Sequence, residues 1–362
     1  MKILILNWRD IKHPQAGGSE LYFHEMAKIW ITKGHEVDWI CGGWENCKKQ
    51  ETIDKINIIR TGKTFSLYLF APIAYLKLKK KPDVIIDIEN GIPFFSPFFS
   101  TKQKILHIHH IHQDVWLKEF NFPLSQIGNF LESKLMPFIY KKIPTTTLSE
   151  SSKKEILEKK YANNIPKMIP PGIEFYKTKK FKKAKEPTLL FLNRIKKYKG
   201  LEILLKAVKI LQKESSQKFN LWVVGEGDDR KRMEDYAKKN NLKNIQFFGR
   251  VSEGKKIELM QKAWVFINPS FKEGWGIVNI ESNYFGTPVL GSNVGGIKDS
   301  VNSGKTGLLF EYGNSDELAK KIKKLINDKK LLKNMEKESI KWAKKFSWEN
   351  AANKFLKVIE RK

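Results

Sequence analysis

Short apolar runs alternate with longer amphipathic segments along the whole chain. In the first half, runs rich in β-branched residues predict strands at 2–7, 36–41, 83–87, 104–109 and 145–148, and helical spacing of apolar positions predicts a helix over 19–33 that ends at Gly34. In the second half, the same patterns predict strands at 188–193, 220–224, 245–248, 265–267 and 288–291, with helices including 201–212 and 229–240. This alternation is typical of βαβ units and parallel sheets.

The composition of the chain changes near its middle. Ile-Pro-Pro-Gly-Ile-Glu at 169–174 is followed by a lysine-rich segment that runs to Lys185. This change indicates a boundary between two α/β domains, which we expect over residues 1–174 and 175–345. Ligands bind beyond the carboxyl ends of the strands in open α/β sheets, so the loops at these ends are the places to search for a site.

The overall composition is that of a folded intracellular protein. The 362 residues are 41% hydrophobic, which suffices for two cores and excludes a disordered chain. Cys41 and Cys47 have neither a zinc nor a redox spacing, and they indicate a reducing compartment. The first apolar run is too short for a signal peptide, and no run approaches the roughly 18–20 apolar residues of a transmembrane helix.

The formal net charge of +28 predicts an acidic partner. Nucleic acid is one alternative, but the sequence contains no recognition helix, RNA-binding strand motif or zinc finger, so we expect no nucleic-acid partner. An anionic membrane surface is the favoured partner. Residues 65–81 mix large apolar residues with lysines, and residues 94–99 read Phe-Phe-Ser-Pro-Phe-Phe. Both segments suit a lipid interface, and both equally suit packing in a core.

The most informative segment is Asn-Pro-Ser-Phe-Lys-Glu-Gly-Trp-Gly-Ile-Val-Asn-Ile-Glu at 268–281. It predicts the end of a strand, a glycine-rich turn that carries Glu273, and a helix that carries Glu281. Backbone N–H groups at such a turn can hold a phosphate. Two alternatives are a glycosidase acid–base pair and a pair of solvated surface glutamates.

This segment resembles the E-x7-E signature of retaining glycosyltransferases, especially glycosyltransferase family 4. Gly286 and the Thr287-Pro288 turn also fall where the family has them. Residues 194–200 are similar to the family's Arg-x4-Lys-Gly segment, with Asn193 in place of a glycine. Residues 225–228 resemble a Gly-x-Gly-Pro turn with aspartate in place of proline, and residues 248–252 resemble the segment that lines the nucleobase.

The resemblance implies the GT-B fold, with two Rossmann-like domains facing a cleft and a last helix, 346–362, that packs back on the first domain. It implies a nucleotide-sugar-dependent hexosyltransferase of the retaining type. Arg194 and Lys199 would balance the diphosphate, Glu281 would hold the ribose hydroxyls, and Glu273 the sugar hydroxyls. His109, or alternatively His110, would orient the sugar. The further substrate-binding residues would be Gly17, Gly18, Gly225, Arg250, Val251, Gly274, Trp275, Gly276 and Ile277.

The resemblance also implies that no metal is required. His107, His109, His110 and His112 crowd one strand end, and a zinc site is the alternative. Apart from Asp114, however, no cysteine or acidic residue stands nearby at ligand spacing. We expect a nucleotide sugar as donor and a glycan or lipid-linked acceptor, with a soluble sugar phosphate as the alternative. We expect the enzyme in the cytoplasm, peripheral on the inner face of the cell membrane.

Overall fold

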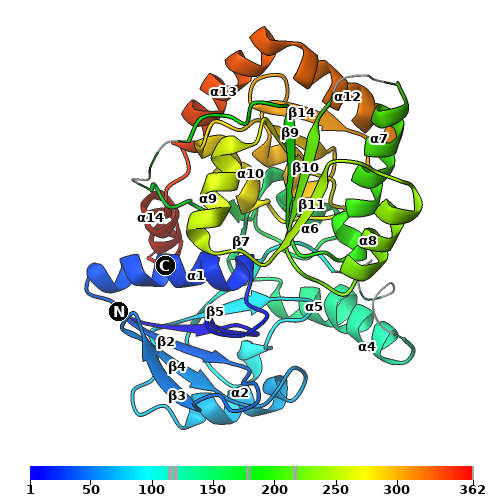
Figure 1. Cartoon of the computed structure of the whole chain (residues 1–362). Coiled ribbons are helices and arrows are strands. Elements are labelled where there is room, and N and C mark those ends of the chain that lie inside the picture. The colour runs from blue at the N-terminus through cyan, green and yellow to red at the C-terminus, as the bar shows by residue number, and fades with distance from the viewer. Residues whose placement is uncertain (113–115, 117–120, 177–178, 180, 215–217, 361–362) are drawn as a thin grey trace. The chain divides into compact units, whose positions relative to one another are not determined.

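The computed structural model, shown in Figure 1, describes residues 1–112, 116, 121–176, 179, 181–214 and 218–360. The chain divides into two compact units. Unit 1 contains residues 1–172 and 348–362, and unit 2 contains residues 173–347. Each unit is an α/β structure built on a mostly parallel sheet, as the alternation of strands and helices predicted. Asp114 lies outside the described residues.

The sheet of unit 1 has eight strands in the order β3-β4-β2-β1-β5-β6-β7-β8. The strands are β1 (Lys2–Leu6), β2 (Glu36–Cys41), β3 (Gln50–Ile53), β4 (Ile56–Arg60), β5 (Val84–Glu89), β6 (Gln103–Ile108), β7 (Thr145–Thr147) and β8 (Lys167–Met168). All neighbouring strands are parallel except β3 and β4, which form an antiparallel hairpin. The central strands β1 and β5 are almost wholly buried, which explains why they read as continuous apolar runs.

Helices pack on this sheet and on one another. They are α1 (Gly18–Thr32), α2 (Leu67–Leu76), η1 (Ser96–Phe98), α4 (Leu124–Phe130), η2 (Leu131–Leu135), α5 (Met136–Tyr140), α6 (Glu150–Glu158) and the C-terminal α14 (Trp348–Ile359). Helices α1 and α14 lie side by side (Figure 1). The buried indole N–H of Trp30 in α1 donates to the carbonyl of Ala352 in α14 at 3.1 Å. The C-terminal helix is therefore part of unit 1.

The sheet of unit 2 has six parallel strands in the order β11-β10-β9-β12-β13-β14. They are β9 (Thr188–Leu192), β10 (Asn220–Val224), β11 (Ile245–Gly249), β12 (Val265–Asn268), β13 (Val289–Ser292) and β14 (Gly307–Phe310). Alternate side chains of β9 enter different cores: Leu189 and Phe191 pack in one apolar cluster and Leu190 in another. Both faces of this sheet are therefore covered, as expected for a parallel sheet.

The covering elements of unit 2 are η3 (Lys197–Lys199), α7 (Leu201–Glu214), α8 (Arg230–Lys239), α9 (Glu253–Lys262), α10 (Ile277–Tyr284), α11 (Gly295–Ser300), α12 (Ser315–Asn327) and α13 (Lys329–Ala343). Helices α7 and α12 pack against each other, as do α10 and α13. Polar Ncap side chains start several of these helices, among them Asp328, which accepts from the N–H of Leu331 at the start of α13. Ser252 accepts from the N–H of Lys255 at the start of α9, and Asn314 accepts from the N–H of Glu317 at the start of α12.

The predicted strands are present with small shifts at their ends, but the β3–β4 hairpin was not predicted from the sequence. Its turn consists of Asp54 and Lys55, both with positive φ (50° and 66°). The usual signal for such a turn is Asn-Gly or Asp-Gly, and lysine in the second position conceals it. This hairpin extends the sheet beyond β2 and brings Arg60 to a strand end.

Two further findings concern the cysteines and membrane spanning. Cys41 is buried, Cys47 is partly exposed, and neither is in a disulfide. Among the described residues, no helix has the length and apolar character needed to cross a bilayer.

Candidate active site

Four loops at the carboxyl ends of the strands in unit 2 pack directly against one another. A Cβ atom on Gly225, which follows β10 and has φ +132°, would lie 1.9 Å from the carbonyl oxygen of Asn193 after β9. A Cβ atom on Gly200 would lie 2.1 Å from the carbonyl oxygen of Pro269 after β12. The N–H of Gly225 also donates to the carbonyl of Gly249 at 2.9 Å. Glycine is required at these contacts because any side chain would separate the loops.

The turn that carries Glu273 is held in place by the start of helix α11, which follows β13. The N–H of Gly296 donates to the carbonyl of Glu273 at 2.9 Å, and a Cβ atom on Gly296 would lie 2.1 Å from the carbonyl oxygen of Gly274. Gly276, with φ +82°, then directs the chain into α10 at Ile277. The backbone of this turn therefore has one defined conformation at the helix N-terminus.

Beneath this turn lies a buried polar network that sequence reasoning missed. The amide of Asn268 donates to Oδ1 of Asn279 at 2.8 Å, and the amide of Asn279 donates to Oγ of Ser300 at 2.8 Å. The hydroxyl of Ser270 donates to Oδ1 of Asn268 at 2.8 Å. All four side chains are buried. A satisfied buried network fixes a single arrangement, and here it joins β12, α10 and α11.

Glu273 and Lys199 are brought together as an ion pair. The Lys199 ammonium contacts Oε1 of Glu273, which also lies 3.2 Å from Oγ of Ser270 and accepts from Nδ2 of Asn193 at 3.5 Å. Lys199 is buried, although the sequence predicted it only as a cation near a helix start. The predicted diphosphate ligand and the predicted sugar ligand therefore share one polar cluster.

Glu281 lies on α10 and is paired with a lysine that sequence reasoning did not single out. Nζ of Lys256 in α9 lies 2.9 Å from Oε1 of Glu281 and 2.9 Å from Oε1 of Glu253. Burial by itself would lower the pKa of Lys256, but the two carboxylates outweigh that effect and the pKa is raised. Lys256 is therefore charged at neutral pH and holds the Glu281 carboxylate in one place.

The remaining predicted residues of unit 2 differ in exposure. Trp275 is buried and its ring packs at 5.4 Å from that of Phe346. Val251 is half-buried, whereas Arg194 and Arg250 are exposed. Among the described residues, neither arginine side chain has a hydrogen bond or an ion pair. Both guanidinium groups are therefore available to a negatively charged ligand.

In unit 1, the Gly-Gly-Ser loop and the histidine run meet. Oγ of Ser19 lies 2.7 Å from Nε2 of His109. Nδ1 of His109 lies 3.3 Å from Nε2 of His107, and Nδ1 of His107 lies 2.8 Å from Oγ1 of Thr146. The Thr146 hydroxyl donates to the carbonyl of Leu106 at 3.4 Å. These contacts form one continuous chain of hydrogen bonds.

Which atom donates in each of these hydrogen bonds follows from the last one, between Thr146 and Leu106. Since the Thr146 hydroxyl proton goes to a carbonyl, Thr146 accepts from Nδ1–H of His107. Nε2 of His107 must then accept from Nδ1–H of His109, and Nε2 of His109 must accept from the Ser19 hydroxyl. Burial, and to a smaller extent His112, lowers the pKa of His109 to about 3, so the ring is neutral at ordinary pH. His109 is buried, and its neighbour His110 is half-buried.

The glycine pair in unit 1 starts helix α1. The N–H of Gly17 donates to the carboxylate of Glu20 at 2.7 Å, which gives the helix start an acidic cap from within the chain. Gly18 follows as the first residue of α1. The N–H of Gly17 is therefore already occupied by Glu20. A phosphate at this loop would lie beside that carboxylate and would have to bind the N–H groups that follow Gly17.

The structure also assembles a group of possible metal ligands that the sequence did not indicate. Glu89, His112 and Glu132 can each bring one ligand atom within 4.8 Å of the other two. Nδ1 of His112 lies 3.2 Å from Oε1 of Glu89, and Oε1 of Glu132 accepts from the N–H of His112 at 2.6 Å. His107 and His109 are not in this group, since both of their ring nitrogens have partners in the chain from Thr146 to Ser19.

Comparison with known proteins gives two family matches that together cover most of the chain. Residues 172–342 match the model described as "Glycosyl transferases group 1", and residues 16–175 match the model described as "Glycosyltransferase Family 4". The first match contains Arg194, Lys199, Glu273 and Glu281, and the second contains Gly17, Gly18 and His109.

Similar proteins point to the same class. The chain is 35% identical over 171 residues to an uncharacterized glycosyltransferase of Methanocaldococcus jannaschii. The aligned residues make up 47% of this chain and 47% of that relative, so the match spans about half the length of each. It is 28% identical over 332 residues to an uncharacterized glycosyltransferase of Haemophilus influenzae, spanning 90% of this chain and 91% of that one. The solved structure of a sucrose-phosphate synthase from Thermosynechococcus elongatus has a TM-score of 0.79 at 20% identity and covers 99% of this chain and 98% of that chain.

Proposed function

We propose that this chain, a glycosyltransferase of the GT-B fold, moves a sugar from a nucleoside diphosphate sugar to an acceptor hydroxyl with retention of the anomeric configuration. The fold and the class of enzyme are established by the two family matches, the relatives and the structural match. The donor, the acceptor and the retaining course are the proposal. Its main support is the polar cluster in which Lys199 and Glu273 meet at the joined loops of unit 2.

Each predicted residue receives a role that its surroundings allow. Arg194 and Lys199 balance the charge that develops on the departing diphosphate, which is the kind of preorganised contact that lowers a barrier most. Glu273, held by Lys199 and Ser270, accepts hydrogen bonds from the sugar hydroxyls. Glu281, held by Lys256, accepts from the ribose hydroxyls. In these assignments the two glutamates contact the groups on either side of the diphosphate of one nucleotide sugar.

In the proposed reaction, the bond between the anomeric carbon and the diphosphate oxygen breaks. A new bond forms between the anomeric carbon and the acceptor oxygen on the same face of the sugar, and the acceptor proton passes to the departing phosphate oxygen. No protein carboxylate becomes covalently attached and no metal takes part. Gly17, Gly18 and His109 act on the substrate from unit 1. Because Nε2 of His109 accepts from the Ser19 hydroxyl, His109 acts here by fixing that hydroxyl, whose oxygen can still accept from a sugar hydroxyl.

The acceptor is proposed to be lipid-linked, and the enzyme is proposed to be peripheral on the cytoplasmic side of the membrane. Helix α2 supports this proposal, since one face packs on the sheet through Leu67, Ala71, Ala74 and Tyr75 while the other face is exposed. Leu69 is 74% exposed and Leu76 is 65% exposed, and Phe65, Phe70 and Ile73 are exposed beside them. Lysines 77, 79 and 80 follow directly. An apolar helix face next to lysines is typical of an interfacial helix.

The aromatic loop at 94–99 contributes to this surface only in part. Phe94 is buried in the same core cluster as α2, whereas Phe98 is 71% exposed. Residues 122–138 carry a separate set of exposed apolar side chains that sequence reasoning missed: Phe122, Leu124, Ile127, Phe130 and Phe138. Large exposed apolar patches mark interaction sites, and these lie in the unit that is proposed to receive the acceptor.

The proposed function is tested by identifying the donor first and the acceptor second. Nucleoside diphosphates and their sugars are screened by thermal shift, and each hit is then incubated with membrane lipid extract or with soluble sugar phosphates while release of the nucleoside diphosphate is followed. The anomeric configuration of the product is read by proton NMR. Inversion at the anomeric carbon would reject the retaining course, and binding of no nucleotide sugar at all would reject the donor class.

A further inference from the structure

A pocket in unit 1 has no role in the proposal above. It is lined by Trp8, Arg9, His13, Gly42, Gly43 and Thr64. These residues come from three loops, which follow the neighbouring strands β1, β2 and β4. The pocket is thus at the carboxyl edge of a parallel sheet, where ligands of α/β proteins bind.

The loop after β1 is anchored beside this pocket by a buried ion pair. Nε of Arg60 donates to Oδ2 of Asp10 at 2.7 Å and Nη2 donates to Oδ1 at 3.0 Å. Both side chains are only 1% exposed. The indole N–H of Trp39 also donates to the carbonyl of Arg9 at 3.2 Å. Since the charge of Asp10 is matched by Arg60 and neither side chain lines the pocket, the pair fixes the loop without making the pocket acidic.

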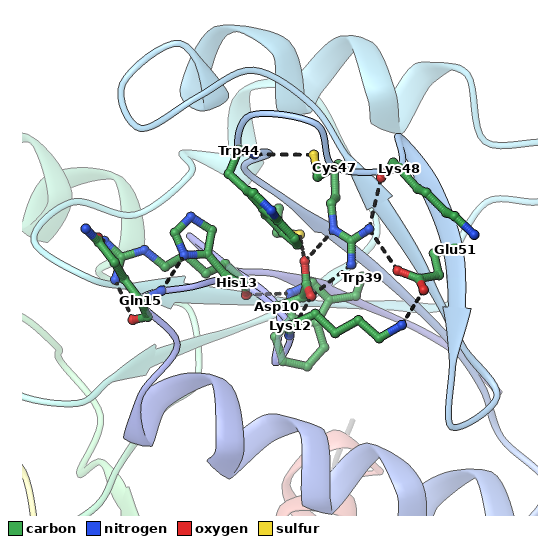
Figure 2. Close-up of polar contacts among 12 residues, drawn as sticks. Asp10, Lys12, His13, Gln15, Trp39, Trp44, Cys47, Lys48 and Glu51 are labelled. Carbon is green, nitrogen blue, oxygen red and sulfur yellow. Dashed lines mark hydrogen bonds and ion pairs between the residues drawn. The ribbon is translucent and has the colours of Figure 1, made fainter. Parts of the chain in front are cut away.

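Gln15 orients the two basic side chains of the pocket. Nη1 of Arg9 donates to the Gln15 carbonyl at 3.1 Å and Nη2 donates to its Oε1 at 2.9 Å. The N–H of Gln15 donates to Nδ1 of His13 at 3.0 Å (Figure 2). In neutral His13 the proton is therefore on Nε2, which is a hydrogen-bond donor. Burial, and next the charge of Arg9, lowers the pKa of His13, so this neutral form prevails near pH 7.

The wall of the pocket is completed by backbone and aromatic surface. A Cβ atom on Gly42 would lie 3.0 Å from the carbonyl oxygen of Trp8, and one on Gly43 would lie 3.0 Å from Sγ of Cys47. The ring of Trp44 packs edge-on against His13 at 5.1 Å. None of the described lining residues carries a carboxylate. A permanent cation, an imidazole N–H and the hydroxyl of Thr64 together offer donors to an anionic oxygen group.

We propose that this pocket binds the phosphate group of the acceptor, with Arg9, His13 and Thr64 as its ligands. The inference rests on the proposed function for the existence of an acceptor, and it names the acceptor's chemical class. A phosphate can come from a sugar that is linked through phosphate to a polyprenyl carrier in the membrane, in which the sugar supplies the acceptor hydroxyl, or from a soluble sugar phosphate. Thr64 is followed at once by Phe65, the first of the exposed apolar side chains that lead into α2. A bound phosphate would thus lie next to the surface that suits the lipid chain of a carrier.

The test compares matched ligands that differ only in the phosphate. Binding of the full-length protein is measured by co-sedimentation with phosphatidylcholine vesicles containing polyprenyl phosphate or, at equal content, the uncharged polyprenol. In a second arm, calorimetry compares glucose 6-phosphate with glucose. The variants are Arg9→Gln and Thr64→Val. The matched control is Lys12→Gln, which removes the same charge from the same loop but at an exposed side chain that contacts Glu51 and does not line the pocket.

We expect the phosphate form of at least one pair to bind more tightly than its uncharged partner. Arg9→Gln should weaken that binding at least tenfold, Thr64→Val should weaken it severalfold, and Lys12→Gln should leave it nearly unchanged. A preference in the vesicle arm identifies a lipid carrier, and a preference only in the calorimetric arm identifies a soluble sugar phosphate. The proposal is overturned if neither arm shows a preference, or if Arg9→Gln and Lys12→Gln lower it equally, which would mean general charge attraction.

The same variants separate this inference from the proposed function. Binding of nucleoside diphosphates, measured on each variant by calorimetry, reports on unit 2. Circular dichroism of each variant, compared with the wild type, shows that unit 1 is folded. If no nucleoside diphosphate binds to any form of the protein while the phosphate preference is intact, the proposed donor fails and the pocket stands. If nucleoside diphosphates bind normally and no phosphate preference is found, the pocket assignment fails and the proposed donor stands.

Discussion

The ammonium group of Lys199 contacts the carboxylate of Glu273, although the two residues are 74 positions apart in the chain. The side chain of Lys199 is 7% exposed and that of Glu273 is 19% exposed, so the pair is largely shielded from water. Removal of one member of such a pair leaves a poorly solvated charge behind. Lys199 therefore differs from Arg194 in a way that its position in the sequence does not reveal, because Arg194 is exposed.

The first prediction concerns these two cations. Lys199→Ala and Arg194→Ala should each lower turnover on the order of 10²-fold, the scale for losing a preorganised charge contact. Lys199→Ala should also lower the free energy of unfolding by about 1–3 kcal/mol, since Glu273 loses its counter-charge. Arg194→Ala should leave that free energy unchanged. Steady-state rates and denaturant unfolding measure both effects, with the exposed neighbour variant Lys197→Ala as control. Near-normal transfer in both variants would refute the assignment.

The second prediction concerns the two glutamates. Glu281→Ala should weaken binding of the nucleoside diphosphate itself, because ribose contacts are lost. Glu273→Ala should spare that binding and impair sugar transfer, because the sugar contacts are lost while Lys199 can still contact the diphosphate. Calorimetry with the nucleoside diphosphate alone separates the two cases, and Glu253→Ala is a control that removes the other carboxylate on Lys256 without touching Glu281. Equal losses of affinity in Glu281→Ala and Glu273→Ala would contradict this division of roles.

The third prediction concerns pH. Burial lowers the pKa of His109 to about 3, whereas an unfolded chain takes up a proton at this histidine near pH 6.5. The contribution of His109 to stability is therefore complete above pH 6.5 and is lost as the pH falls from 6.5 toward 3. Between pH 7.5 and pH 5 the wild type should lose about 2 kcal/mol from this group.

His109→Gln provides the comparison for this prediction. The variant should be less stable than the wild type at pH 7.5, since it disturbs the hydrogen bonds to Ser19 and His107, yet it should lose less stability on acidification. Urea unfolding at pH 7.5 and pH 5, followed by a signal of unit 1, gives the two differences. If the wild type and the variant lose equal stability between these pH values, His109 does not titrate as described.

The fourth prediction concerns metal. Protein treated with EDTA should retain full transfer activity, because the proposed reaction uses cationic side chains on the diphosphate. The group formed by Glu89, His112 and Glu132 is the place where a metal would bind if this prediction were wrong. Loss of activity on chelation, with recovery by one divalent metal in the wild type but not in Glu132→Gln, would overturn metal independence and identify that group as the site.

The fifth prediction concerns the membrane. The protein should co-sediment with anionic vesicles at low salt and less at high salt, since each lysine near an anionic surface contributes about 1 kcal/mol that salt screens. Replacement of the exposed Leu69 and Leu76 by serine should weaken binding severalfold, and the same change at the exposed Ile165 of unit 1, which lies outside α2, should not. A wild type that ignores anionic vesicles at low salt would favour a soluble acceptor.

The sequence by itself determined the alternation of strands and helices, the division into two α/β parts and the class of enzyme. These properties are carried by local patterns: apolar periodicity, glycines in fixed turns and the spacing of Glu273 and Glu281 on one turn and helix. These patterns can be recognised without knowing which strands become neighbours, because the residues that form each pattern lie within one or two successive elements of the chain.

Only the tertiary structure decided which side chain pairs with which. The ion pairs of Glu273 and Glu281, the hydrogen-bond chain from Thr146 to Ser19 and the pocket beside Asp10 all join elements that are separated in the sequence. Their meeting depends on the strand order, which places β9 next to β12 and β1 next to both β2 and β5. The exposed face of α2 has the same cause. In the sequence, the apolar residues of α2 suit a buried core and an exposed surface equally. The packing of α2 on β2 decides which of them are exposed to solvent.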